Sequence, residues 1–157
     1  YVEKTFDQSV DVFTPPQNLY NMKGLTAIMN NKLAICSDLP SIKSLSTLKL
    51  LGIENYMRFF LFKLYNRDLQ FPFPILYDKF KIIGHHRLQP GTDMKKLYAD
   101  FESVRNKNGI FVLSTHSYGF DFKMKNTDLR MGDALKELIN YAKNISGIEF
   151  VKLVDCF

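Results

Sequence analysis

The sequence has no tryptophan, only two cysteines and no long apolar run, and the last two shortages each exclude a class of protein. Cys36 and Cys156 stand alone, without the short Cys–X–X–Cys or Cys–X–X–His spacing of a zinc knuckle, and they are too few for a disulfide framework. The longest apolar stretch, at 56–65, is interrupted by Arg58 and Lys63 and is too short to cross a bilayer. We therefore expect no transmembrane helix.

Motifs that mark several common enzyme classes are also missing. The chain contains no GxGxxG or GxxxxGK[ST] loop for phosphate binding, no HExxH metal motif and no GxSxG nucleophile elbow. These absences argue against a nucleotide-dependent enzyme and against a serine hydrolase of the α/β type. The chain opens at Tyr1 without a charged segment followed by an apolar one, so we expect no signal peptide within it.

The composition is that of a folded protein. A chain of 157 residues, of which 46% are hydrophobic and 24% charged, can bury a sizeable core, so we expect one domain or one piece of a larger domain. The net charge of +5 permits phosphate binding without requiring it, and no nucleic-acid motif accompanies the positive excess. Nucleic acid is therefore not an expected partner.

Short β-type runs alternate with amphipathic stretches, which is the pattern of βα units with a parallel sheet. The expected strands are 10–13, 33–36, 80–83, 110–115 and 150–153. The expected helices are 18–30, 41–51, 94–104 and a last one that is capped by Asp128 or Asp133 and stops at Gly147. The run at 110–115 is apolar almost throughout, as in a strand buried on both faces. In the last helix, four apolar residues recur at helical spacing and should be buried against the sheet. They are Leu135, Leu138, Ile139 and Ala142.

Polar side chains follow two of the expected strands at their carboxyl ends, where parallel α/β folds bind ligands. One group is the loop at 14–18 and the other is the loop at 115–121, which contains His116. Histidine's ordinary pKa lies near neutrality, so a histidine at this position suits proton transfer. A histidine that merely hydrogen-bonds at a strand end fits the same pattern. We expect the two loops to line one cleft.

At these residues the chain resembles the polysaccharide deacetylase family, the NodB-homology carbohydrate esterases. Phe13-Thr14-Pro15-Pro16-Gln17-Asn18 resembles the family's F-x-P-P-x-N loop, and Val112-Leu113-Ser114-Thr115-His116 resembles its LxLH motif with threonine at the second leucine. The tail at 134–153 is similar to the closing helix and strand. The resemblance covers most of this chain but only the later βα units of the family's domain. It implies an α/β fold that is a partial or distorted (β/α) barrel with parallel strands.

The resemblance also implies an activity, which is metal-dependent deacetylation of N-acetylated sugars in polysaccharide or glycoconjugate metabolism. His116 matches the histidine that protonates the leaving group. The expected substrate-binding residues are Pro15, Pro16, Gln17, Asn18, Leu113 and Ser117. The implied cofactor is a divalent metal, zinc by the family's chemistry, whose ligands belong to motifs upstream of the proline loop, so we expect no metal ligand in this chain. The implied partners are a carbohydrate substrate and either a further chain segment or a second copy that covers the open side of the barrel.

Three alternatives stay open at this point. His85 and His86 are neighbours on an expected strand and point to opposite faces, so we favour a surface or packing role over a metal or cleft role. The segment at 53–80 is rich in Phe and Tyr and carries most of the excess positive charge. We interpret it as an insertion that buries its rings on the barrel or against a partner subunit, in preference to a glycan-binding lobe. Finally, the family commonly has arginine where this chain has Thr14, which leaves a non-catalytic module that binds glycan or a partner protein as the alternative function.

Overall fold

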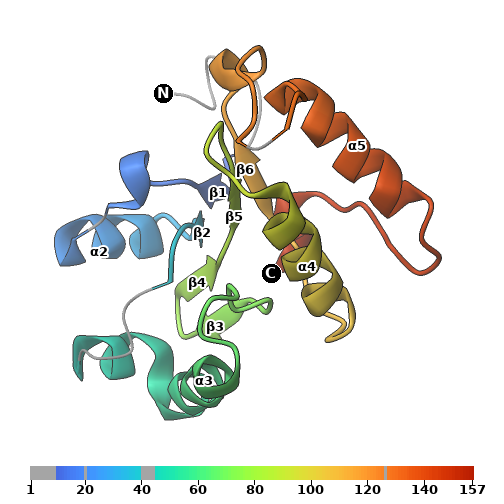
Figure 1. Cartoon of the computed structure of the whole chain (residues 1–157). Helices are drawn as coiled ribbons and strands as arrows, with labels where there is room; N and C mark the ends of the chain where they lie inside the picture. Colours follow the sequence, from blue (N-terminus) through green and yellow to red (C-terminus); the bar gives the residue numbers. More distant parts are fainter. Residues whose placement is uncertain (1–9, 20, 40–44, 126) are drawn as a thin grey trace. The chain divides into compact units, whose positions relative to one another are not determined.

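The computed structural model describes residues 10–19, 21–39, 45–125 and 127–157. They form two compact units (Figure 1). The first unit comprises the described residues up to Gly84 together with Lys152–Phe157, and the second is His85–Val151. Each unit has its own sheet and its own apolar core. The prediction of an α/β fold with parallel strands is confirmed, although the described strands form two separate sheets and do not close into a barrel.

The first unit is built on a four-stranded sheet with the order β1-β2-β4-β3. Its strands are β1 (Val12–Phe13), β2 (Ala34–Cys36), β3 (Ile75–Tyr77) and β4 (Phe80–Ile83). β1, β2 and β4 run parallel, whereas β3 pairs antiparallel with β4. Ile35 in β2 lies between Phe13 in β1 and Ile82 in β4. The carboxyl ends of the three parallel strands therefore meet at one edge of this sheet.

Two helices cover the apolar residues of this sheet. α2 (Met22–Asn30) begins four residues later than predicted, because Asn21 accepts a 2.9 Å hydrogen bond from the Gly24 amide and so caps the helix. α3 (Leu45–Tyr65) extends well beyond the predicted helix at 41–51, whose first four residues lie outside the described part. The core of the unit consists of Leu25, Ile28, Ile35, Leu51, Phe59, Phe71, Ile75, Phe80 and Ile82.

The aromatic segment at 53–80 supplies much of this core. The Phe71 ring meets the rings of Phe59, Phe62 and Phe73 edge to face, at centroid distances of 5.5, 5.2 and 5.5 Å. Such edge-to-face pairs stabilise a core beyond the area that they bury. Phe80 is also buried, in β4. The interpretation that this segment serves packing is thus supported for these rings.

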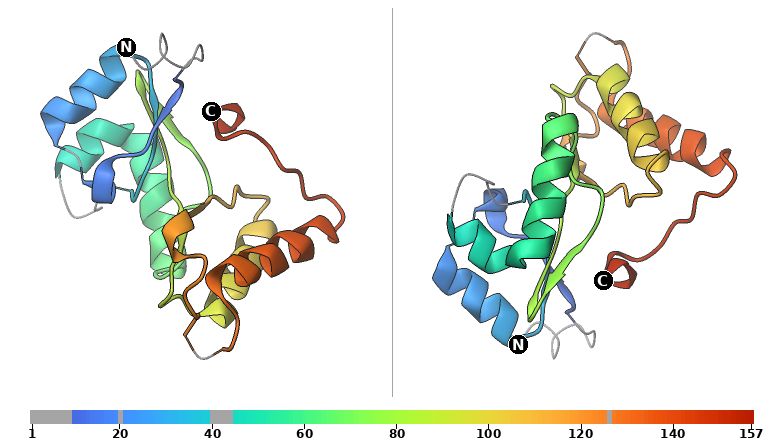
Figure 2. Two further views of the ribbon diagram at one scale, coloured as in Figure 1. Left: turned by 90° about the horizontal axis from the view of Figure 1, so that it is seen from above. Right: turned by 90° about the horizontal axis from the view of Figure 1, so that it is seen from below.

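α3 is two helical pieces joined at Gly52, and Figure 2 shows the two pieces meeting at an angle. Gly52 has φ 72° and ψ 159°, a combination that is essentially restricted to glycine. A Cβ atom at this position would also overlap the ring of Tyr77. Both the turn of the chain and the close approach of the β3 tyrosine therefore require glycine here.

Replacing Gly52 by Ala should lower the free energy of unfolding by more than the same change at Gly147. Gly147 also has a positive φ, 80°, but a Cβ atom there would meet nothing within 4 Å. Gly147→Ala therefore measures the cost of a positive φ without overlap, about 1 kcal/mol, and the excess for Gly52→Ala combines its more restricted φ/ψ combination with the overlap with Tyr77. Urea unfolding of both variants tests this, and equal losses would contradict the tight contact. The Gly52→Ala loss should shrink when Tyr77 is also changed to Ala.

The second unit has two parallel strands and two helices. β5 (His86–Leu88) pairs with β6 (Leu113–Thr115), and α4 (Met94–Arg105) and α5 (Met131–Lys143) follow the strands in the chain. Of the two residues that could cap α4 by their type, Thr92 and Asp93, it is Asp93 that accepts hydrogen bonds from the amides of Lys95 and Lys96. The core of the unit consists of Leu88, Leu97, Met124, Met131, Ala134 and Leu138.

Three predictions for the chain after residue 109 are wrong. The residues at 150–153 do not form a strand, since Phe150 and Val151 are mostly exposed and Leu153–Cys156 is a single 3-10 turn. Only 113–115 of the run at 110–115 is a strand. The whole run is half-buried and not buried on both faces, since its strand belongs to a sheet of only two described strands. No side chain caps α5, where Arg130 occupies the capping position and Asp133 falls in the first turn.

The face that α5 buries agrees in part with the prediction. Leu138 and Ala142 are buried as expected, whereas Leu135 and Ile139 are half-buried. The buried face is instead completed by Met131 and Ala134. The buried residues at 131, 134, 138 and 142 also recur at helical spacing, but their face is turned about the helix axis relative to the predicted one. No helix in the described part of the chain is long and apolar enough to cross a membrane.

Truncating Leu138 to Ala should lower the free energy of unfolding by roughly 2 to 5 kcal/mol, since the residue is 4% exposed and packs in the second core. The neighbouring Glu137 is exposed on the same helix, so Glu137→Ala is the matched control and should change stability by less than about 0.5 kcal/mol. Chemical denaturation followed by circular dichroism measures both. A similar small loss for the two variants would show that this face does not support the unit.

Candidate functional site

His116 lies directly after the carboxyl end of β6, as the sequence predicts. Its backbone is extended, with φ −120° and ψ 128°, and its carbonyl accepts a 3.0 Å hydrogen bond from the Gly119 amide at the start of a 3-10 turn, Ser117–Gly119. The residue itself is exposed. An imidazole at the end of a strand, held by its backbone and open to solvent, is accessible to a bound substrate.

The ring of His116 stacks on the ring of Tyr118, with centroids 5.1 Å apart and planes inclined by 17°. Tyr118 is 76% exposed, so much of its surface remains open to a ligand. Ser117, an expected substrate-binding residue, lies between these two residues in the sequence and is also exposed. Leu113, a second expected substrate-binding residue, is half-buried in β6, where it pairs with His86 of β5. The exposed polar and aromatic groups therefore come from one short segment, 116–118.

The proline loop lies in the first unit, after β1. Pro16–Asn18 form a short 3-10 turn, and Gln17 and Asn18 have φ of 55° and 56°. Two successive non-glycine residues in the left-handed region are unusual, and such strain often marks a functional segment. Pro15 is buried and its carbonyl accepts a hydrogen bond from the Asn18 amide, whereas Pro16 and Gln17 are exposed. The loop thus projects Gln17 toward solvent.

Ser37 is a residue at this edge that sequence reasoning missed. It follows β2 directly, is fully buried, and its hydroxyl donates a 3.3 Å hydrogen bond to the Asn18 side-chain oxygen. Its amide donates to the carbonyl of Ile83, at the end of β4. Ser37 therefore joins the ends of two strands to the proline loop. Its position directly after the predicted strand at 33–36 is the signal that could have found it.

The predicted site residues fall in both units. Pro15, Pro16, Gln17 and Asn18 belong to the first unit, and Leu113, His116 and Ser117 belong to the second. Within each unit they follow a parallel strand, except Leu113, which lies in β6. That the two groups line a single cleft stays a prediction.

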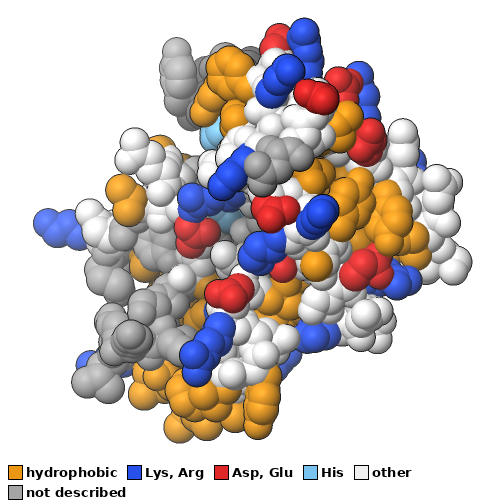
Figure 3. All heavy atoms as spheres, viewed as in Figure 1, with side chains coloured by type: hydrophobic (Ala, Val, Ile, Leu, Met, Phe, Trp, Pro, Cys, Tyr) orange, Lys and Arg blue, Asp and Glu red, His pale blue; other side chains and the backbone are white. Residues whose placement is uncertain are grey.

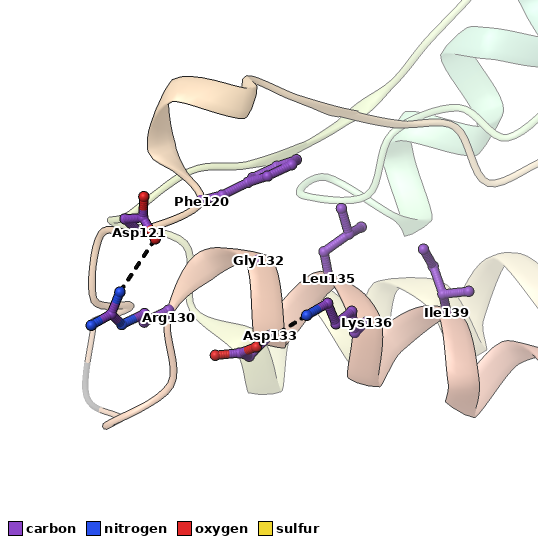
Figure 4. Close-up of a pocket in the computed structure, with 8 residues that line it drawn as sticks. All are labelled: Phe120, Asp121, Arg130, Gly132, Asp133, Leu135, Lys136 and Ile139. Carbon is purple, nitrogen blue, oxygen red and sulfur yellow. Dashed lines mark hydrogen bonds and ion pairs between the residues drawn. The ribbon is translucent and has the colours of Figure 1, made fainter.

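A groove of about 270 Å³ runs beside α5 in the second unit (Figure 4). Phe120, Leu135 and Ile139 supply its apolar surface. Leu135 and Ile139, the two of these that belong to α5, are half-buried because they face this groove. Its polar rim consists of two exposed ion pairs, Arg130–Asp121 at 3.2 Å and Lys136–Asp133 at 3.6 Å. Exposed pairs of this kind stabilise the fold little and can exchange partners with a ligand. The groove begins four residues after His116, at Phe120.

His85 and His86 are both buried, which agrees with a packing role. The His86 ring stacks on Phe111 with centroids 4.3 Å apart, and its amide donates to the Val112 carbonyl at 2.7 Å. Neither ring nitrogen of His86 has a hydrogen-bond partner among the described residues. Burial lowers the pKa of His86 to about 4, against a smaller opposing effect of Asp100. The residue is therefore neutral at pH 7.

The stability of the protein should fall in mild acid because of His86. Unfolding exposes the imidazole and restores its ordinary pKa near 6.5, so below that pH the unfolded chain binds a proton that the folded chain excludes until about pH 4. The free energy of unfolding is then highest above about pH 6.5 and declines toward pH 4, by at most about 1.4 kcal/mol per pH unit. His86→Phe, which keeps a ring against Phe111, should remove this decline. Urea unfolding at several pH values measures it, with exposed His116→Gln as the control, and an unchanged slope in His86→Phe would assign the decline to another group.

The described residues do not fit a metal centre. Among them, no group of three or more His, Cys, Asp or Glu side chains lies close enough together to hold a metal ion. A zinc ion of the kind that the family resemblance implies would have to take its ligands from elsewhere. Cys36 is buried, and burial, with a smaller effect of nearby Cys156, raises its pKa to about 11. Its thiol is thus protonated at neutral pH.

Comparison with known proteins gives no relative: no protein-family model, curated protein or solved structure matches this chain. The function must therefore be argued from the site itself.

Proposed function

We propose that this chain carries the proton-donating part of a polysaccharide deacetylase-like site, which hydrolyses the carbon–nitrogen bond of an N-acetylated sugar. The proposal includes the fold: the described βα units would be the later part of the family's distorted (β/α) barrel. The observation that carries it is the position of His116, exposed directly after a parallel strand and stacked on an exposed tyrosine.

The role of His116 in this reaction is that of a general acid. When the tetrahedral intermediate of amide hydrolysis collapses, the departing nitrogen must accept a proton, because an amide anion is a very poor leaving group. An imidazolium within hydrogen-bond reach of that nitrogen supplies the proton as the bond breaks. The exposed position of His116 allows such an approach.

The surroundings of His116 support a sugar as the substrate. Tyr118 is 76% exposed and Phe122, four residues further on, is 54% exposed. Aromatic faces stack on the apolar faces of sugar rings, while the ion-paired rim of the α5 groove offers carboxylates and cations to hydroxyl groups. In the proposed site, Ser117 binds the substrate beside His116. In the first unit, Ser37 positions Asn18 of the proline loop through its hydrogen bond.

Replacing His116 by Ala should lower kcat for release of acetate from an acetylated amino sugar by about 10²- to 10⁴-fold, while KM changes little. A general acid acts on the nitrogen only as the bond breaks, so its contribution appears in the transition state. Acetate release by the full-length protein is the measurement, and Lys123→Ala, an exposed change on the same loop, is the control. Undiminished release by His116→Ala would remove this residue from the mechanism.

One observation favours a second function, a non-catalytic module that binds glycan. The exposed rings of Tyr118 and Phe122 would serve binding as well as catalysis. This alternative predicts no turnover by the parent protein and weaker glycan binding by Tyr118→Ala. Isothermal titration with an acetylated chito-oligosaccharide, performed beside the acetate assay, distinguishes the two functions.

A further inference from the structure

The second piece of α3 carries a stripe of exposed apolar residues, which we call the α3 stripe. After the break at Gly52, its four members follow at intervals of four, four and three residues, so they share one face of the helix. They are Ile53, Met57, Leu61 and Leu64, with exposed fractions of 74%, 44%, 48% and 51%. Phe59, buried in the core, lies on the opposite face. Hydrophobic side chains gather over α3 at the lower edge of Figure 3.

The apolar surface extends beyond the stripe. Tyr65, at the end of the helix, is 85% exposed. Five exposed apolar side chains along one helix are more than the singly scattered hydrophobic residues of an ordinary monomer surface. A patch of this size indicates a protein contact.

Charges beside the stripe match those of a second copy. Glu54 and Arg58 are both exposed and flank the same side of the stripe, one turn apart. A two-fold axis perpendicular to the helix reverses its direction but brings the same flank of each copy together. With the axis near Met57, Ile53 of one copy lies level with Leu61 of the other. Along the helix axis, Glu54 of each copy is then offset from Arg58 of the other copy by about two residues, or ~3 Å.

We infer that the α3 stripe is the contact surface for a second copy of this chain, which packs on it antiparallel about a two-fold axis near Met57. Ile53 and Leu61 interlock across the axis, and two equivalent Glu54–Arg58 pairs close one flank. The inference is independent of the proposed deacetylase function, because the stripe lies in α3 of the first unit and His116 in the second.

Sedimentation velocity over a range of concentrations provides the first test. The full chain should show a reversible monomer–dimer equilibrium, and Leu61→Asp should weaken it by more than about tenfold in Kd, because it buries an unpaired carboxylate at the contact. Phe150→Asp, a change at a 61% exposed apolar residue outside the stripe, is the matched control and should dimerise normally. Circular dichroism shows whether each variant is folded.

A charge exchange tests the two-fold pairing itself and uses only exposed positions. Glu54→Arg alone and Arg58→Glu alone should each weaken the dimer by up to about tenfold, since each places like charges opposite one another twice. The double variant Glu54→Arg/Arg58→Glu should restore the affinity, because the reciprocal pairs are rebuilt with opposite sign. Met57→Cys should form an intermolecular disulfide in a Cys156→Ser background, whereas Phe150→Cys should not.

A chain that stays monomeric at every concentration would overturn the inference. So would a dimer that Leu61→Asp leaves intact, since it would use another surface. A double charge variant no stronger than the single ones would exclude the antiparallel two-fold arrangement. Monomeric chain that instead co-sediments with vesicles of phosphatidylcholine and phosphatidylserine, and loses this binding in Leu61→Asp, would assign the stripe to a lipid surface.

Discussion

The parallel pairing of β2 with β4 is the constraint on which the first unit depends. Ile35 and Ile82 lie opposite each other in these strands and are both fully buried, so neither can move without opening the core. The pairing joins segments that are nearly fifty residues apart in the chain, and the entropy of closing that loop must be offset by burial of the residues between them. α3 and the aromatic residues that follow it supply this burial. The same pairing brings Ser37 to the end of β4 and thereby fixes the edge that holds Asn18.

Much of the local structure could be predicted from the sequence because local chemistry determines it. Asp93 caps α4 where an aspartate precedes an amphipathic run, and Phe80–Ile83 is a strand as its apolar pattern indicates. His116 follows β6 because a strand-forming run ends just before it. These features depend on neighbours in the chain, which a sequence displays directly.

Features that depend on distant partners could not be predicted in the same way. The run at 150–153 has the composition of a strand but stays irregular, since composition supplies no partner with which to pair. The face of α5 is rotated from 135 and 139 toward 131 and 134, because the core that receives it includes Met124 from a preceding loop. Ser37 and the exposed stripe of α3 became apparent only once the hydrogen bond to Asn18 and the exposed fractions were known.

The first unit is discontinuous in sequence, since Lys152–Phe157 rejoins it after the whole of the second unit has intervened. During synthesis the chain leaves the ribosome from its amino end, so the β1-β2-β4-β3 sheet emerges long before the last six residues that belong with it. The second unit is contiguous and can fold as soon as it is released. The core of the first unit contains none of these six residues, so its sheet and core can form before they emerge, and only the docking of Lys152–Phe157 must wait until they are synthesised.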